Sequence, residues 1–166
     1  SKVIKHNSDN NIYELYKKIM VFLLKTDMNI YIFRHSNEDL DFCKAIYNLT
    51  KRHNRVRLFE DDFNAIELFN LLDNFKFIVG SRYHSIVHSY KNAVPALIIG
   101  WAVKYKEISE LFNQEKYVFD IRNTLNFDNV ISKLKELNKS YRQDSRIINN
   151  KIESFKENNI FNSIRE

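Results

Sequence analysis

Residues 75–101 read FKFIVGSRYHSIVHSYKNAVPALIIGW, and this stretch decides the fold. Two apolar runs, Phe75–Val79 and Ala96–Ile99, are short, rich in β-branched residues and interrupted only by Lys76, which is typical of strands buried on both faces. The residues between them, Ser81–Tyr90, space their apolar side chains as a helix does. A strand, a helix and a second strand in this order predict a parallel pair joined by a crossover.

The same alternation continues on both sides of this stretch. Towards the N-terminus we predict a helix over 8–24, a strand over 29–33, a helix over 37–51, a strand over 56–59 and a third helix carrying Phe63, Ile66, Phe69 and Leu72. Towards the C-terminus we predict a helix over 103–112, a short strand over 117–119 and further helix from about residue 127. The pattern indicates the α/β class: a doubly wound, mainly parallel sheet of about five strands with helices on both faces, as in a Rossmann-like lobe.

Length and composition set the limits of this reading. The chain has 166 residues, 44% of them hydrophobic, which suits one globular domain over 1–166 with a helical tail at 147–166. The net charge of +5 is spread over both halves and suits an anionic ligand or a membrane surface. A single cysteine, Cys43, fits a reducing compartment, and no apolar run is long enough to cross a bilayer, so we expect a cytoplasmic protein.

Both glycines of the chain, Gly80 and Gly100, directly follow predicted buried strands, where a tight turn or a close backbone approach needs a residue without a side chain. Ser81 is placed to cap the next helix, whose first amide groups and positive dipole end then face the crevice beyond the strands. Ligands of open parallel sheets bind at that edge. We therefore expect an anion at the loop after Gly80.

Cationic side chains cluster in the loops that follow the predicted strands. Arg82 offers two-point binding of a phosphate or carboxylate, His84 can exchange a proton near neutral pH, and Lys104 follows the second glycine. Arg34 and His35 follow the first strand and are expected at the same edge. The alternative is structural: Arg82 pairs with a neighbouring acid, His84 is an ordinary surface histidine, and Arg34 and His35 face solvent.

Other candidates are weaker. His84 and His88 lie four residues apart on one helix, but no third ligand is evident and we expect no metal. Cys43 falls among apolar residues at helical spacing and is predicted to be a core thiol. The basic residues Lys51, Arg52, His53 and Arg55 fit the solvated end of a helix, and without stacking aromatics beside them we expect no nucleic acid.

The stretches VRLFEDD, FKFIVGSRYHSIVHSYKNAVPALIIGW, KYKEISELF and YVFD together resemble the C-terminal half of the polysaccharide pyruvyl transferase family, from Val56 to Asp120, and the resemblance fades before Asn29 and after Asp120. It rests on a buried strand that runs into Gly-Ser-Arg-x-His, then a helix, a turn with Pro95, a second buried strand, and an aromatic residue three places before a lysine. The resemblance implies a glycosyltransferase-B-like enzyme with two lobes. This chain would be the C-terminal lobe, inactive by itself, and the N-terminal lobe would be missing.

The resemblance also implies a reaction. Family members move the pyruvyl group of phosphoenolpyruvate onto two hydroxyls of a sugar, with no other cofactor, and the acceptor is a polysaccharide or its lipid-linked precursor. Carried over, Arg82 and Lys104 bind the donor with Ser81, and His84 is the catalytic acid; Arg34 and His35 are further donor-binding candidates. Such a role in exopolysaccharide or cell-wall synthesis would place the protein in the cytoplasm, peripherally at the inner face of the membrane.

Two other functions remain open at this point. A sugar-nucleotide glycosyltransferase has the same two-lobed architecture, and its donor diphosphate would occupy the same helix N-terminus. A non-catalytic module would instead use Phe155, Ile160 and Phe161 to dock a partner. In either enzyme we expect the segment after Ile147 to pack on the missing lobe.

Overall fold

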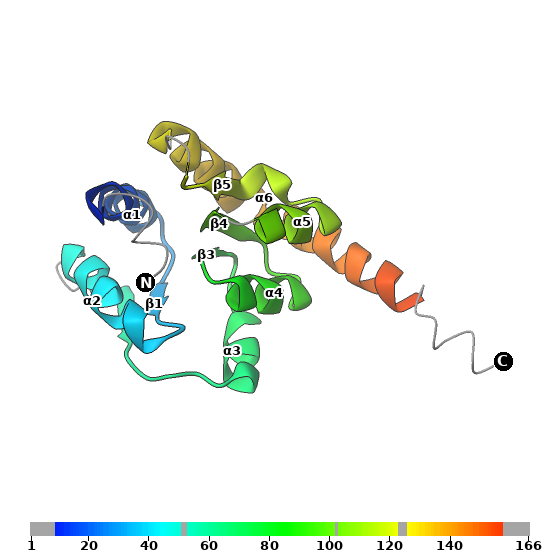
Figure 1. Cartoon of the computed structure of the whole chain (residues 1–166), viewed down its shortest axis with the longest axis horizontal. Coiled ribbons are helices and arrows are strands. Elements are labelled where there is room, and N and C mark those ends of the chain that lie inside the picture. The colour runs from blue at the N-terminus through cyan, green and yellow to red at the C-terminus, as the bar shows by residue number, and fades with distance from the viewer. Residues whose placement is uncertain (1–8, 51–52, 102, 123–125, 158–166) are drawn as a thin grey trace. The chain divides into compact units, whose positions relative to one another are not determined.

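The computed structural model describes residues 9–50, 53–101, 103–122 and 126–157, and its helices and strands are drawn in Figure 1. The chain divides into two compact units, which we describe separately. Unit 1 comprises Ser1–Asn64 and Ile121–Ser132, and unit 2 comprises Ala65–Asp120 and Lys133–Glu166. None of the described helices is both long and apolar enough to cross a membrane.

Unit 1 is built on a two-stranded parallel sheet. Its elements are α1 (Asp9–Leu24), β1 (Ile30–Phe33), the 3-10 turn η2 (Asn37–Asp39), α2 (Leu40–Leu49) and β2 (Val56–Phe59). The strands pair from Ile30 opposite Val56 to Phe33 opposite Phe59. Helix α1 buries a stripe of apolar residues at helical spacing, namely Ile12, Leu15, Ile19 and Leu23.

Unit 2 is built on a three-stranded parallel sheet in the order β3-β4-β5. Its elements are α3 (Ala65–Leu72), β3 (Ile78–Gly80), α4 (Tyr83–Lys91), β4 (Ala96–Gly100), α5 (Val103–Leu111), the 3-10 turn η3 (Glu115–Tyr117), β5 (Val118–Asp120) and, from Lys133 onward, α6 (Phe127–Glu157). Every residue of the central strand β4 is buried. Helices α4 and α5 lie side by side, since the Tyr90 hydroxyl is 3.2 Å from Ser109 Oγ and its ring packs on Phe112.

The predicted fold class is confirmed: all strand pairs are parallel, and helices connect successive strands. The five predicted strands exist, but they lie in two separate sheets of two and three strands rather than in one. Strand β3 also begins three residues later than predicted. Its partner strand begins at Ala96, because Pro95 has no N–H to donate, and the Pro95 carbonyl accepts from the Ile78 amide at the start of the ladder.

Arg55 corrects the prediction that the basic residues after α2 are a solvated helix end. Its guanidinium donates to the carbonyls of Leu24 at 2.9 Å, Met28 at 3.0 Å and Thr26. Leu24 is the last residue of α1, where a helix leaves its carbonyls without intrahelical donors, and Thr26 and Met28 follow in the next few residues. Arg55 therefore closes the C-terminal end of α1. Lys51 and Arg52 of the same cluster lie outside the described residues.

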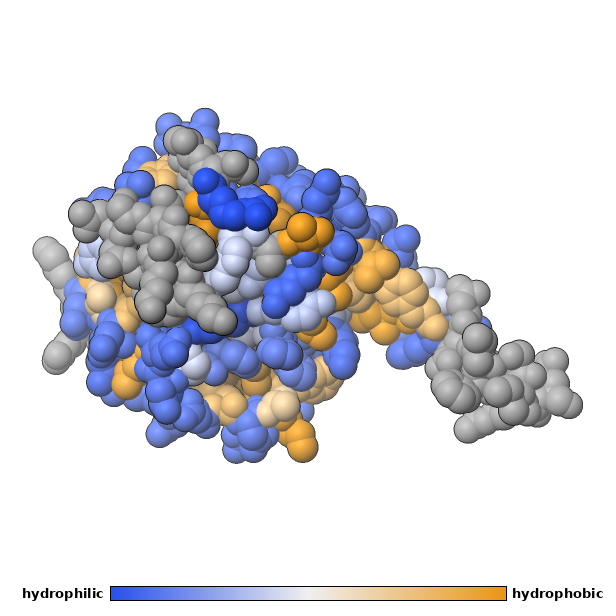
Figure 2. Space-filling view, in the orientation of Figure 1, coloured by the Kyte–Doolittle hydropathy of each residue, from blue (hydrophilic) through white to orange (hydrophobic). Residues whose placement is uncertain are grey.

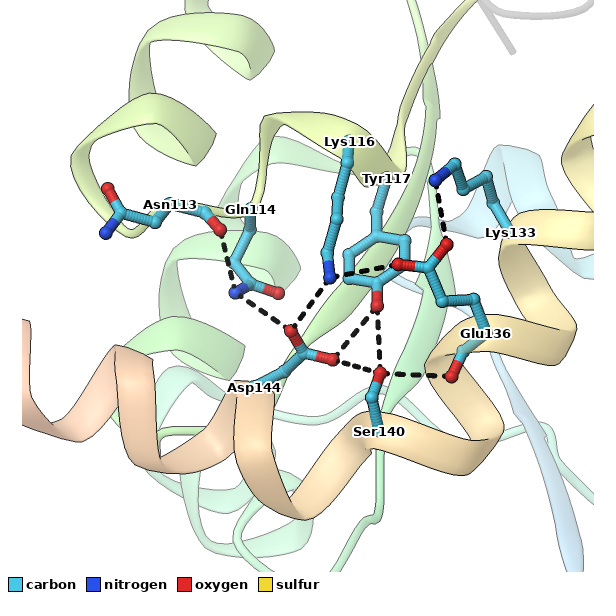
Figure 3. A network of polar contacts seen from close by, with 8 residues as sticks. All are labelled: Asn113, Gln114, Lys116, Tyr117, Lys133, Glu136, Ser140 and Asp144. Atoms are coloured by element: carbon cyan, nitrogen blue, oxygen red, sulfur yellow. Dashed lines mark hydrogen bonds and ion pairs between the residues drawn. The ribbon is translucent and has the colours of Figure 1, made fainter.

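Helix α6 is fixed to unit 2 by a buried carboxylate (Figure 3). Asp144 is 1% exposed and accepts hydrogen bonds from the Ser140 hydroxyl at 2.6 Å and the Tyr117 hydroxyl at 2.9 Å. Lys116 Nζ lies 3.4 Å from Asp144 and 3.0 Å from Glu136, so it joins both acids of this helix segment. A buried carboxylate is tolerated only when it is paired in this way. Asp144 thus fixes the position of α6 against η3.

Beyond this network, α6 continues to Glu157, and residues 158–166, which include Ile160 and Phe161, lie outside the described residues. The Phe155 ring packs edge-on against Phe112 with centroids 5.8 Å apart, and Leu111 beside it is 53% exposed. Figure 2 shows hydrophobic surface along this part of α6. The described end of α6 therefore carries apolar surface next to α5.

Candidate functional site

The loop between β3 and α4 leads from the sheet directly into the start of a helix. Arg82 is the N-cap residue of α4, in extended conformation, and its side chain caps none of the helix amides. The prediction that Ser81 caps this helix is therefore wrong by one residue. The first turn of α4 contains no acidic residue, so the positive end of the helix dipole is not offset from within the helix.

Tyr105 of α5 forms a hydrogen bond with the loop between β3 and α4. Its hydroxyl donates to the Ser81 carbonyl at 2.7 Å, although Ser81 precedes it by 24 residues. Burial raises the pKa of Tyr105, while the positive charge of Arg82 opposes that rise. The buried tyrosine therefore remains a neutral hydrogen-bond donor beside the Arg82 guanidinium.

Gly100 makes room for Tyr105. A Cβ at position 100 would lie 2.6 Å from Cε2 and 2.7 Å from Cδ2 of the Tyr105 ring, which is closer than carbon atoms can approach. The ring therefore packs on the backbone at the end of β4. The expectation of a close approach at this glycine is confirmed.

Gly80, unlike Gly100, is not required by the packing around it. Its φ is not positive, and an added Cβ would meet only Ile78 Cδ1, at an ordinary contact distance of 3.9 Å. The described residues thus leave space for a side chain at the carboxyl end of β3. Neither backbone conformation nor packing within the protein requires glycine there.

Lys104 is brought to the start of α4 by aromatic rings. Its Nζ lies 4.6 Å from the centroid of the Tyr83 ring and 5.7 Å from that of Tyr105, and the two rings meet edge to face at 6.0 Å. A cation over an aromatic face is held electrostatically without being neutralised. The ammonium, exposed to solvent, therefore adds positive charge next to the first turn of α4.

His84 occupies the first turn of the same helix and is exposed, with its ring 6.1 Å from that of Tyr83. Arg82 and Tyr83 are half-buried. Four of the six predicted site residues, Ser81, Arg82, His84 and Lys104, thus lie in unit 2 around the first turn of α4. Together they form what we call the α4 site, which combines helix amides, two permanent cations and an imidazole.

Arg34 and His35 lie in unit 1, directly after β1. The Arg34 side chain is 9% exposed: its Nε donates to the Glu60 carbonyl at 2.6 Å, and its Nη1 contacts Asn37 and, at 2.7 Å, Asp62. The guanidinium therefore ties the loop after β1 to the loop after β2. His35 is half-buried in the same loop. β1 belongs to a separate sheet from β3 and β4, so the loop after β1 does not share a sheet edge with the loops after β3 and β4.

His88 and Cys43 are the weaker candidates, as a metal ligand and as a nucleophile. His88 packs edge-on against Phe69 of α3, and burial lowers its pKa, with the nearby Lys91 and His84 acting in the same direction. Cys43 is buried in unit 1 with its Sγ 3.7 Å from the Phe33 carbonyl, and burial raises the pKa of its thiol to about 11. A thiol that stays protonated is a poor nucleophile, so the prediction of a core cysteine is confirmed.

Tyr83 and Tyr105 were not among the predicted site residues, although they position Lys104 and Ser81. Gly100 was the feature of the sequence that could have indicated Tyr105. A glycine at a strand end often marks a place where another group approaches the backbone closely, and Tyr105 follows five residues later.

The fold and the α4 site together define an α/β protein with a cationic helix N-terminus beyond parallel strands, an arrangement suited to phosphate-bearing ligands. The sequence model of the polysaccharide pyruvyl transferase family matches residues 1–102, well over half of the chain, and the protein belongs to this family. The match reaches farther towards the N-terminus than the expected limit at Asn29, includes the loop from Gly80 to His84, and ends two residues before Lys104. No curated protein and no solved structure matches the chain.

Proposed function

We propose that the α4 site binds phosphoenolpyruvate and that the protein transfers its pyruvyl group, as a ketal, to a sugar of a polysaccharide or of a lipid-linked precursor. The observation that carries the proposal is the position of Arg82: it is the N-cap residue of α4, two residues after β3, beside a first helical turn that has no acid, in a chain of the polysaccharide pyruvyl transferase family.

The charges of the donor match those of the site. Phosphoenolpyruvate carries a phosphate and a carboxylate, and each is bound well by helix amides, a guanidinium or an ammonium. We place the phosphate over the first turn of α4, where Arg82 can bind it through two parallel hydrogen bonds. Lys104, held over the Tyr83 ring, then supplies the second cation. The space at Gly80 favours this placement, because a ligand can approach the backbone there.

His84 is assigned the proton transfers. In its protonated form it donates a proton to the methylene carbon, which becomes a methyl group and leaves an oxocarbenium-like centre at C2. A sugar hydroxyl adds to C2, and its proton returns to the imidazole. The bond between C2 and the phosphate oxygen then breaks, a second hydroxyl adds, and its proton leaves with the phosphate. One donor and two hydroxyls thus give one ketal and one inorganic phosphate.

The cations have a second role in this scheme. Phosphate departs with its negative charge, and Arg82 together with the α4 amides stabilises that charge as the C–O bond breaks. Lys104 neutralises the carboxylate that remains on the pyruvyl group. Loss of Arg82 is therefore expected to impair both donor binding and phosphate departure.

Titration calorimetry of the chain with phosphoenolpyruvate tests the proposal, with uridine and guanosine diphosphates as comparison ligands. We expect binding of phosphoenolpyruvate that weakens at least tenfold in Arg82→Ala, since a charge-assisted pair contributes about 1.5–3 kcal/mol. Lys91→Ala removes a cation from the opposite end of the same helix and is the matched control. Preferential binding of a nucleoside diphosphate would instead support a glycosyltransferase, and equal affinity in both variants would overturn the site.

A further inference from the structure

A stripe of four basic residues runs along α6 in unit 2. Lys135, Lys139, Arg142 and Arg146 follow one another at intervals of four, three and four residues, and all four are exposed. At about 100° per residue this spacing places them within roughly one-sixth of the helix circumference. We call this set the α6 stripe. It extends for about 16 Å along the helix axis.

The α6 stripe lies on the side of the helix opposite the core. The buried residues of this part of α6 are Leu134, Leu137, Asp144 and Ile148, which fall about half a turn away from the stripe. The two acids of the segment, Glu136 and Asp144, are both within ion-pair distance of Lys116. They therefore do not offset the charge of the stripe, and no residue that the structure describes forms an ion pair with any of its four members.

The residues that flank the stripe are polar and uncharged. On this side of α6, between residues 133 and 150, they are Asn138, Gln143, Asn149 and Asn150. A stable protein interface needs an apolar centre, which this face lacks. The helix also cannot insert its apolar side between lipids, because that side is buried in unit 2. The stripe is thus suited to purely electrostatic contact.

The aromatic ring of Tyr141, beside the stripe, is in contact with two cations. Tyr141 has Lys76 Nζ at 5.7 Å and Arg142 Cζ at 5.5 Å from its centroid, and the ring is half-buried. Single-stranded nucleic acid is usually bound by aromatic rings on which its bases stack. Tyr141 is the only aromatic residue between 132 and 150, and two cations already lie against its ring, so this described segment of α6 offers bases no second ring on which to stack.

We infer that the α6 stripe binds the surface of an anionic phospholipid bilayer, and holds the protein there peripherally and reversibly. An extended anionic surface can contact all four side chains of a straight row at once, and their charges complement those of acidic headgroups. The association depends on ionic strength, because it involves exposed charges only. It does not depend on the donor proposed for the α4 site.

Vesicle flotation with the intact chain tests this inference. We expect the protein to float with vesicles of phosphatidylcholine mixed with phosphatidylglycerol, to remain unbound with pure phosphatidylcholine, and to dissociate in high salt. Changing all four stripe residues to Gln should weaken binding at least a hundredfold, since each cation near such a surface contributes about fivefold. Circular dichroism checks that this variant remains folded, as expected for exposed positions.

A matched variant separates the stripe from net charge. Changing Lys17, Lys25, Lys91 and Lys106 to Gln lowers the net charge of +5 by the same four units but leaves the α6 stripe intact. It should retain most of the binding. Equal loss in the two variants, or no binding to the anionic vesicles, would overturn the inference. So would a single-stranded oligonucleotide that binds more tightly than vesicles and depends on the same four residues.

Discussion

The Tyr105 hydroxyl donates to the carbonyl of Ser81 at 2.7 Å, and it thereby connects the start of α5 to the residue that precedes the N-cap of α4. The contact is possible because the tyrosine ring lies against Gly100, where a Cβ would collide with it. The loops that follow β3 and β4 are therefore connected to each other. The connecting residue is Tyr105, which carries no charge.

Tyr105→Phe removes this hydrogen bond and keeps the ring on Gly100. We expect a loss of about 1 kcal/mol in the free energy of unfolding, the usual contribution of one such bond. If the proposed donor site is right, binding of phosphoenolpyruvate also weakens several-fold, since Ser81 and Arg82 are less well positioned. Urea unfolding and calorimetry measure the two effects. Tyr47→Phe, at a half-buried tyrosine of α2 whose hydroxyl forms no hydrogen bond with a described residue, is the control and should change neither.

The two glycines should respond oppositely to the same substitution. Gly100→Ala forces a methyl group into the Tyr105 ring and is expected to destabilise the protein by about 1–3 kcal/mol. Gly80→Ala meets only a normal contact with Ile78 and should leave the unfolding midpoint nearly unchanged.

Donor binding distinguishes the two positions a second time. With the phosphate over the first turn of α4, a methyl group at position 80 reduces the space for the ligand, so Gly80→Ala should weaken binding of phosphoenolpyruvate while the protein remains stable. A Gly80→Ala variant that binds the donor like the wild type would show that the ligand does not approach this backbone.

The elements themselves were largely predictable from local pattern. Ala96–Ile99 is apolar throughout, and β4 is indeed buried at every residue. Helix α1 was predictable from the spacing of Ile12, Leu15 and Ile19. The burial of Cys43 was predictable because it lies among apolar residues at the same helical spacing. These features depend on neighbours in sequence, which periodicity reports directly.

What could not be predicted depends on partners distant in sequence. Arg34 and Arg55 are cations near strand ends, as Arg82 is, but their guanidinium groups bind carbonyls 26 and about 30 residues away. Nothing in the local pattern shows in advance which arginine binds a distant backbone carbonyl. The division of the strands between two sheets has the same origin, because strand pairing is a long-range choice.

Asp144→Asn should be the most damaging change in the α6 network. The amide cannot accept from Ser140, Tyr117 and Lys116 as a carboxylate does, and these groups are left incompletely paired next to a buried residue. We expect a loss of about 2–3 kcal/mol, measured by urea unfolding at neutral pH. Glu136→Gln removes a partly exposed partner of the same lysine and should cost less than about 1 kcal/mol. Equal losses would show that Asp144 is not the anchor of α6.

The pH dependence of stability should report His88. Burial holds the pKa of His88 below that of an ordinary histidine, about 6.5. As the pH falls through that value, the unfolded chain takes up a proton that the folded protein does not, so the free energy of unfolding decreases with acidification until His88 itself becomes protonated. The physical reason is local: Nδ1 is buried with no hydrogen-bond partner among the described residues, so a second N–H would be unsatisfied.

His88→Gln removes this titration, and the difference in stability between wild type and variant should shift in favour of the variant as the pH falls below about 6.5. Urea unfolding across this range measures the difference, and a constant difference would show that the imidazole titrates alike in both states.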